Sequence, residues 1–176
     1  IRVPLFIDFP GNTLKGDSCV VPVTGADLYP TFLDMAGIPL MPGQHQDGVS
    51  LLPLLQGKSI PERALYWHYP HYGNQGGEPS SIIRQGDWKL IHYYEDGRDE
   101  LYNLRIDETE SEPLNVQYPE KVEFLSKKLS VWLTEVGARY PEPDPQYNPA
   151  AEALYKKKTR ERMMKTLEAT RKKQLG

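Results

Sequence analysis

The sequence predicts an α/β fold, of α+β type within this segment, and three observations support that class. Residues 1–9 are β-rich and apolar on both faces, which is typical of a strand buried in a parallel sheet. Residues 64–104 alternate apolar and polar side chains around short Gly-containing turns, the pattern of antiparallel strands. From Pro119 onward, apolar residues recur at helical spacing. We therefore expect the end of an α/β domain, followed by a small antiparallel sheet packed by a helix.

The first sixty residues contain one further helix signal. Pro10 and Gly11 end the predicted strand. Thr24 and Asp27 have the spacing of a helix start, in which an acid three residues after Thr favours the positive helix end. The apolar residues Leu28, Phe32 and Met35 then fall on one face, and Gly37 is a natural stop. A short apolar piece at 49–55 is expected to form a helical turn.

Residues 64–104 hold two of the three tryptophans and three of the four histidines. We predict strands at 66–69, 81–84, 88–93 and 100–103, joined by turns at 85–87 and 95–98. A flexible loop is expected at 73–79. Beyond the sheet, a helix is predicted from Pro119 to near Gly137, an extended tail at 140–149, and a basic helix at 154–174.

These elements suggest three parts, at 1–60, 61–140 and 141–176. The net charge of −3 gives no global reason to expect a nucleic acid as partner. The apolar runs are far shorter than the roughly 20 residues of a membrane-spanning helix. Cys19, the one cysteine, allows no intrachain disulfide and so leaves the compartment open. Because the chain opens at Ile1 inside an apolar run, we expect the natural protein to continue upstream.

Six phrases occur in an order that resembles one enzyme family. They are IRVPLFIDFPG, TGADLYPTFLDMAGIPL, DGVSLLPLLQGK, ALYWHYPHY, IRQGDWKLI and DELYNLRIDETESEPLNV. Together, over residues 1–137, they resemble the C-terminal part of a formylglycine-dependent sulfatase of the arylsulfatase type, within the alkaline-phosphatase-like superfamily. The resemblance implies that residues 1–60 are the C-terminal end of the large α/β domain of such an enzyme. Residues 61–140 are then its small C-terminal subdomain.

The resemblance places the catalytic machinery outside this segment. In the family, the nucleophile is a formylglycine made from Cys or Ser within a C/S-x-P-x-R signature. Cys19 stands in DSCVVPV, without that proline and arginine, and is not that residue. The family's divalent metal, usually calcium, is held mainly by upstream Asp and Asn residues, whose oxygens suit a hard cation. We therefore expect no catalytic residue and no metal ligand here.

The resemblance also implies that the WHYPHYG segment approaches the mouth of the active site. We predict substrate contacts for His68, His71, Tyr72 and Asn74. An imidazole can donate a hydrogen bond to a sugar hydroxyl or a sulfate oxygen, and a tyrosine ring offers a stacking face. For His68, a half-buried structural role is an equal alternative. His92 and His45 are expected to have no site role, and the three tryptophans to form core between sheet and helix.

The sequence thus indicates the C-terminal portion of a sulfuric ester hydrolase that acts on a sulfated small molecule or glycan. Such enzymes work in periplasmic, extracellular or lysosomal-type compartments, which is what the resemblance implies for this protein. The segment alone is expected to be inactive and to supply scaffold and pocket rim. A phosphodiesterase or phosphatase of the same superfamily and a non-catalytic module that binds sulfated glycans are the alternatives. For the basic helix at 154–174, a solvated surface helix is favoured over contact with an anionic polysaccharide or a membrane.

Overall fold

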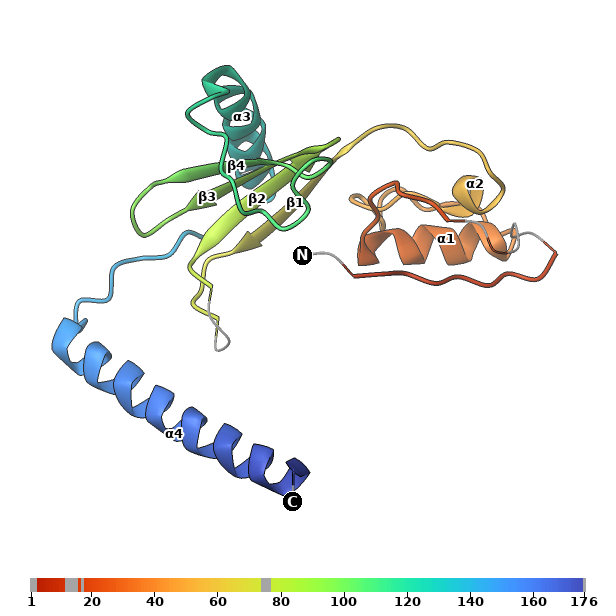
Figure 1. Cartoon of the computed structure of the whole chain (residues 1–176). Coiled ribbons are helices and arrows are strands. Elements are labelled where there is room, and N and C mark those ends of the chain that lie inside the picture. Colours follow the sequence, from red (N-terminus) through yellow and green to blue (C-terminus); the bar gives the residue numbers. More distant parts are fainter. Residues whose placement is uncertain (1–2, 12–15, 17, 74–76, 176) are drawn as a thin grey trace. The chain divides into compact units, whose positions relative to one another are not determined.

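A computed structural model describes residues 3–11, 16, 18–73 and 77–175 of this chain. The chain forms two compact units, Ile1–Ala138 and Arg139–Gly176. In the first unit, two short N-terminal helices precede a four-stranded sheet and the helix that packs on it, whereas the second unit consists mainly of one long helix (Figure 1).

The predicted helix after Thr24 is confirmed. A 3-10 turn at Gly25–Asp27 leads into α1 (Leu28–Met35), and the Thr24 N–H donates to the Asp27 carboxylate over 2.7 Å. Gly37, at φ +68°, ends the helix, because its N–H bonds to the Asp34 carbonyl while the Ile38 N–H reaches the Leu33 carbonyl. This pair of bonds is the Schellman motif expected at a glycine stop. A further helical turn, α2, covers Leu52–Leu55 as predicted.

The predicted buried face of α1 is wrong in one respect. Phe32 is 60% exposed, whereas Pro30 and Thr31 are buried. Thr31 tolerates burial because its hydroxyl donates to the Asp27 carbonyl over 2.5 Å and accepts the Leu51 N–H over 2.9 Å. Thr31, whose hydroxyl has both hydrogen bonds, is therefore buried while the larger apolar side chain of Phe32 is exposed.

The strand predicted at residues 1–9 is not observed in its described part, residues 3–9. Val3 and Phe6 are 86% and 89% exposed. A strand requires a hydrogen-bonded neighbour, and the strands of the described chain all belong to the later antiparallel sheet. Apolar character alone is thus insufficient to form a strand here.

The antiparallel sheet is confirmed, with three of its four strands slightly longer than predicted and the third strand as predicted. It consists of β1 (Ala64–Tyr69), β2 (Ser80–Gln85), β3 (Trp88–Tyr93) and β4 (Asp99–Asn103), in the order β1-β2-β3-β4. The β2–β3 turn contains Gly86 at φ +57°, and the β3–β4 turn contains Gly97 at φ +70°. Glycine adopts these left-handed conformations without the steric cost of a Cβ, so the two turns fix the register of three strands.

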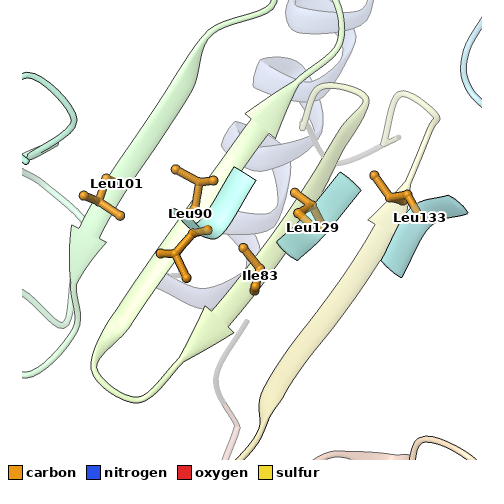
Figure 2. Packing of buried hydrophobic residues seen from close by; sticks show 6 residues of the cluster. Ile83, Leu90, Leu101, Leu129 and Leu133 are labelled. Atoms are coloured by element: carbon orange, nitrogen blue, oxygen red, sulfur yellow. The ribbon is translucent and has the colours of Figure 1, made fainter. Parts of the chain in front are cut away.

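The core lies between one face of this sheet and α3 (Pro119–Glu135). Leu125, Leu129 and Leu133, each four residues apart, pack against a row of apolar side chains from neighbouring strands. Figure 2 shows Leu129 and Leu133 beside this row. That row comprises Ile83, Leu90 and Leu101, each 0% exposed, with the partly buried Tyr66 beside them. Helix α3 ends at Gly137 in a second Schellman motif, because the Ala138 N–H bonds to the Leu133 carbonyl and the Gly137 N–H to that of Thr134.

Two of the three tryptophans pack in this core as predicted. Trp132 stacks on Tyr66 with ring centroids 4.8 Å apart, and Trp88 packs against the same cluster. Trp67 is the exception, because it packs against Ile82, Ile91 and Tyr102 in a second cluster. Neighbouring residues on a strand point to opposite faces, so Tyr66 and Trp67 cannot both face α3.

The second unit contains α4, which covers Pro149–Leu175 and starts five residues before the predicted position. Asn148 caps its start, since its Oδ1 atom accepts the N–H groups of Ala150 and Ala151 over 3.0 and 3.1 Å. No helix in the described part of the chain is long and apolar enough to cross a membrane.

Candidate substrate-contacting site

A row of polar side chains crosses all four strands, on the sheet face that carries the core. It is made by His68, Ser81, His92 and Asp99, which pair in register from β1 to β4. Each lies two residues along its strand from a member of the apolar row under α3, so strand alternation puts both rows on one face. The sheet therefore presents an apolar band under α3 with a polar band beside it.

His68 is held within this row by side-chain hydrogen bonds. Its Nδ1 atom lies 2.7 Å from the Ser81 hydroxyl, which is 0% exposed. The Ser81 hydroxyl lies 2.6 Å from the Tyr94 hydroxyl, and the Tyr94 ring meets the His68 ring edge to face with centroids 5.9 Å apart. His68 is thus half-buried and oriented through its Nδ1 atom.

His92 occupies the other half of the row. Its Nδ1 atom lies 2.8 Å from Asp99 Oδ1, and its ring meets Tyr94 edge to face at 5.3 Å. Tyr94 therefore stands between the two histidines. Both histidines are thus held by side-chain hydrogen bonds, and their functional roles stay predictions.

Three aromatic side chains lie at the end of β1 and the start of the following loop. Tyr69 and Tyr72 are 52% and 63% exposed, and His71 is also exposed. The rings of Tyr69 and His71 meet edge to face with centroids 5.6 Å apart. His71 and Tyr72 are thus placed where a ligand in solvent can reach them, and Tyr69 joins them although it was not predicted. Asn74, the fourth predicted residue, lies outside the described residues.

The loop that carries these residues is fastened at both ends. The Gly73 N–H bonds to the Gly77 carbonyl over 3.2 Å, and the Tyr94 N–H to the Pro79 carbonyl over 3.0 Å. Arg98 in the β3–β4 turn lies 2.7 Å from the Glu78 carboxylate and also stacks over the Tyr93 ring at 3.7 Å. One salt bridge and one backbone hydrogen bond therefore connect the loop to the β3–β4 hairpin.

The opposite face of the sheet carries a carboxylate between two tyrosines. Glu100 accepts hydrogen bonds from Tyr102 over 2.8 Å and from Tyr93 over 3.2 Å. Burial, and then the charge of Glu100 and the hydrogen bond to it, raise the pKa of both phenols above its ordinary value, which keeps both hydroxyls protonated. These tyrosines act as hydrogen-bond donors, which suits a structural role.

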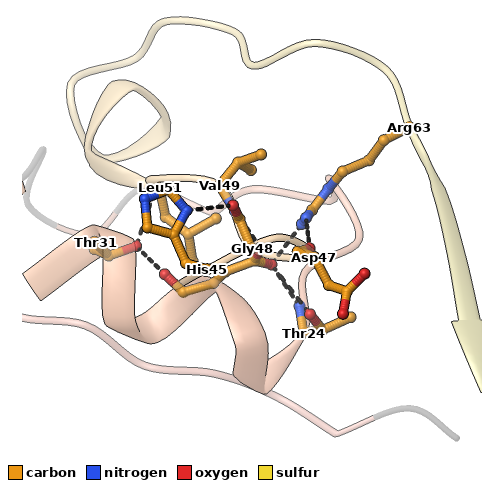
Figure 3. A network of polar contacts seen from close by, with 9 residues as sticks. Thr24, Thr31, His45, Asp47, Gly48, Val49, Leu51 and Arg63 are labelled. Atoms are coloured by element: carbon orange, nitrogen blue, oxygen red, sulfur yellow. Dashed lines mark hydrogen bonds and ion pairs between the residues drawn. The ribbon is translucent and has the colours of Figure 1, made fainter. Parts of the chain in front are cut away.

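A second polar network holds the N-terminal part of the first unit together. The buried carboxylate of Asp27 accepts hydrogen bonds from the Thr24 N–H, the Val49 N–H over 3.0 Å, and an Arg63 guanidinium nitrogen over 2.5 Å. Burial raises the pKa of Asp27, but these bonds and the Arg63 charge outweigh it, so the pKa lies below its usual value. Thr24, Val49 and Arg63 come from three different segments (Figure 3), and all three bond to the Asp27 carboxylate. The network is a structural clamp.

The described residues gather no group of three or more His, Cys, Asp or Glu side chains that could hold a metal ion. Cys19 is exposed and bears no disulfide.

Comparison with known proteins identifies the family. Residues 1–138 match the family described as N-sulphoglucosamine sulphohydrolase, C-terminal. The chain belongs to this sulfatase family. Arylsulfatase K of Mus musculus is 33% identical over 138 residues, 73% of this chain and 24% of the relative.

Two solved structures show the same fold in other sulfatases. One, in complex with its substrate D-glucosamine-2-N,6-O-disulfate, is 33% identical with a TM-score of 0.52 and covers 61% of this chain and 23% of its own. Another, a 2-O GAG sulfatase, is 27% identical with a TM-score of 0.52 and covers 68% of this chain and 27% of its own. The chain thus spans about a quarter of the length of these sulfatases. The predicted family and its alkaline-phosphatase-like α/β fold are confirmed.

Three residues that contact His68 or His92 were not predicted from the sequence. Ser81, Tyr94 and Asp99 surround the predicted histidines. The turn at Gly86 was predicted, and it pairs Ser81 with His92, so counting outward from that turn could have found this pair. Nothing in the sequence signals the position of Tyr94, because it follows the end of β3.

Proposed function

We propose that this chain is the C-terminal portion of an enzyme that hydrolyses sulfate esters of carbohydrates. The observation that carries this proposal is the match of residues 1–138 to a sulfatase family. The substrate class is supported by the solved relative in complex with a disulfated glucosamine. The alternatives, a phosphate-cleaving enzyme or a binding module without chemistry, have no comparable support among the relatives described above.

In this proposal, the end of β1 and the following loop form a rim of the substrate pocket. His71 donates a hydrogen bond to a sugar hydroxyl or to a sulfate oxygen, and a protonated ring adds a positive charge. Tyr72, and Tyr69 beside it, offer exposed rings against which a sugar ring packs. His68 contributes from its fixed orientation, held by Ser81 and Tyr94. Asn74 retains its proposed role as a polar contact.

The bond-breaking chemistry is assigned to sequence upstream of Ile1. Family resemblance implies that a formylglycine supplies the nucleophile and that a divalent metal, usually calcium, stabilises the charge that develops. The described residues contribute scaffold and substrate recognition in this proposal. The same resemblance carries the proposal of a periplasmic, extracellular or lysosomal-type compartment.

The test has two arms. The first is the sequence encoded upstream of Ile1, where we expect a C/S-x-P-x-R signature; its absence from a complete reading frame would remove the sulfatase proposal. The second compares, in the protein that carries that signature, His71→Ala with His45→Ala during hydrolysis of D-glucosamine-2-N,6-O-disulfate. We expect His71→Ala to raise KM by about tenfold, the loss of one charge-assisted hydrogen bond. His45→Ala serves as the control, and equal kinetics of the two variants would remove His71 from the pocket.

The chain of residues 1–176 by itself is expected to have no sulfatase activity. A nitrophenyl sulfate assay with and without calcium checks this, because metal-dependent turnover by this chain would show that the catalytic groups lie within it.

A further inference from the structure

The terminal helix α4 carries a concentration of positive charge that the family match does not account for. The match ends at residue 138, and α4 lies in the separate unit that begins at Arg139. Between residues 154 and 173 there are nine Lys or Arg and two Glu, an excess of seven positive charges. Since the whole chain has a net charge of −3, the rest of the chain carries −10. The basic character is thus confined to one element.

The charges on α4 are presented to solvent. All nine cationic side chains are exposed along the helix, which is about 40 Å long at 1.5 Å per residue. Lys156 pairs with Glu152 over 2.6 Å, one turn earlier. Two glutamates within the segment are too few to neutralise nine cations. Concentrating like charges costs self-repulsion, which a polyanionic partner would relieve.

The distribution of side chains around α4 argues against two kinds of partner. At 100° per residue, the basic residues spread over about 260° of the helix circumference. The larger apolar side chains are each about half exposed and form no continuous stripe: Leu154, Met163, Met164 and Leu167. A helix that lies in a membrane surface, or that docks in an apolar groove, needs such a stripe. A partner that binds by charge along the helix fits the pattern better.

We propose that α4 is a binding surface for a sulfated polysaccharide. Sulfate groups repeat along such a chain, and Arg and Lys bind them through charge-assisted hydrogen bonds. The choice of sulfate over other anions rests on the proposed function, since the substrate class there is a sulfated sugar. One of the solved relatives is described as a 2-O GAG sulfatase, and glycosaminoglycans are polysaccharides.

The connection to the first unit suits this role. Residues 139–148 form neither helix nor strand and contain three prolines, at 141, 143 and 145, with a fourth at the start of α4. Pro-rich segments act as semi-rigid spacers. A tethered second binding surface raises the effective concentration of the polymer near the first unit without any new contact there.

The experiment measures binding of dextran sulfate to the chain of residues 1–176 at 50 and 200 mM NaCl, with uncharged dextran as the reference polymer. The test variant combines Lys157→Gln, Lys158→Gln and Arg160→Gln, because glutamine keeps helix propensity while removing charge. The matched control combines Lys58→Gln, Arg105→Gln and Lys127→Gln, three exposed cations of the first unit. Circular dichroism is used to check that both variants keep the helix content of the parent chain.

We expect the test variant to bind dextran sulfate at least about tenfold more weakly at 50 mM NaCl, with a shallower salt dependence, since fewer counterions are exchanged. The control should stay within about twofold of the parent chain. Equal losses in the two variants would overturn the proposal. So would tighter binding of the parent chain to duplex DNA or to phosphatidylserine vesicles than to dextran sulfate at the same salt.

The outcome is separable from that of the proposed function. If the upstream sequence contains no C/S-x-P-x-R signature but dextran sulfate still binds through α4, the enzyme proposal is overturned and the proposed binding surface stands. If the enzyme hydrolyses the disulfated monosaccharide but the α4 substitutions do not change binding of dextran sulfate, the enzyme proposal stands and the proposed binding surface is overturned.

Discussion

The hydroxyl oxygen of Ser81 lies 2.7 Å from Nδ1 of His68 and 2.6 Å from the hydroxyl oxygen of Tyr94. A serine hydroxyl has one proton to donate and two lone pairs that accept. It can therefore donate to His68 and accept from Tyr94, or do the reverse, but it cannot donate to both. The state of one ring is thus coupled to that of the other through a buried serine.

Replacing Ser81 by alanine tests this coupling. We expect Ser81→Ala to reduce the free energy of unfolding by about 1–3 kcal/mol, because His68 and Tyr94 lose a hydrogen-bond partner in a part-buried site. The 15N chemical shifts of the His68 ring should change as well. Ser80→Ala, one residue earlier and on the other face of the sheet, is the control. Unchanged His68 shifts in Ser81→Ala would show that the serine does not orient the ring.

The buried Asp27 carboxylate predicts a specific pH dependence of stability. Its pKa is lowered in the folded state, so its contribution to stability is full above the unfolded pKa of about 4 and is lost as the pH falls through the folded pKa. Asp27→Asn should reduce the free energy of unfolding by about 3 kcal/mol at pH 7, because it leaves Arg63 without its partner. Urea unfolding at pH 7, 5, 4 and 3 measures the gap between the two proteins.

The gap between parent and Asp27→Asn should narrow as the pH falls below about 4, because the unfolded parent chain takes up a proton there while the folded carboxylate, with its lowered pKa, is still ionised. Asp96 and Asp107, whose pKa values are lowered mainly by hydrogen bonds from Arg98 and from the Glu112 N–H, add to the slope in both proteins. The comparison therefore cancels their effect. A gap that stays constant from pH 7 to 3 would contradict the role of the Asp27 charge.

Gly48 lies too close to another segment to accept a side chain. A Cβ at this position would overlap the carbonyl oxygen of Ala26 and lie 3.2 Å from the Pro30 ring. Because the obstacle is backbone, Gly48→Ala should lower the unfolding free energy by about 2 kcal/mol or more. Gly43→Ala, where a Cβ would meet nothing within 4 Å, should change stability by less than about 0.5 kcal/mol. Thermal unfolding of the pair checks the close approach, and equal melting temperatures would refute it.

The packing of α3 on the sheet makes a prediction about the core. Leu129 is 3% exposed within the cluster of Ile83 and Leu90, so Leu129→Ala should cost about 2–5 kcal/mol of stability. Val131, two residues later on the same helix, is 51% exposed, and Val131→Ala should be nearly neutral. Chemical denaturation of both variants separates core packing from helix propensity. Similar losses for the two would mean that α3 does not bury the face shown in Figure 2.

Local signals predicted the sheet and the helices well. The turns at Gly86 and Gly97 require φ > 0, which few other residues adopt cheaply, and strand alternation then assigned most faces. Thr24 and Gly37 marked α1 in the same way. Each of these features depends on residues within a few positions of one another, which a single sequence displays directly.

Contacts between distant residues were beyond reach. Asp27 was predicted only as an acid at a helix start, yet its partner Arg63 lies 36 residues away. In the candidate site, the exposure of His71 and Tyr72 could be predicted from the composition of their loop. The hydrogen bonds that orient His68 could not be predicted, because they depend on strand pairing, which places Ser81, and on Tyr94, which lies beyond β3. Residues 3–9 were predicted to form a strand from their apolar composition alone, and they do not, because composition does not supply the neighbouring strand that the hydrogen bonds require.

The polar row and the apolar row share the strands β2, β3 and β4, offset by two residues in each. An insertion or deletion of one residue between Ile83 and the turn at Gly86 would move Ile83 and Ser81 to the opposite face together, so it would destroy the core and the histidine arrangement at once. The loop between β1 and β2 is under no such restriction, because its length does not enter the register of the β2–β3 hairpin. During divergence, this protein can therefore alter the loop that carries His71 by gain or loss of residues, while its sheet can change only by substitution.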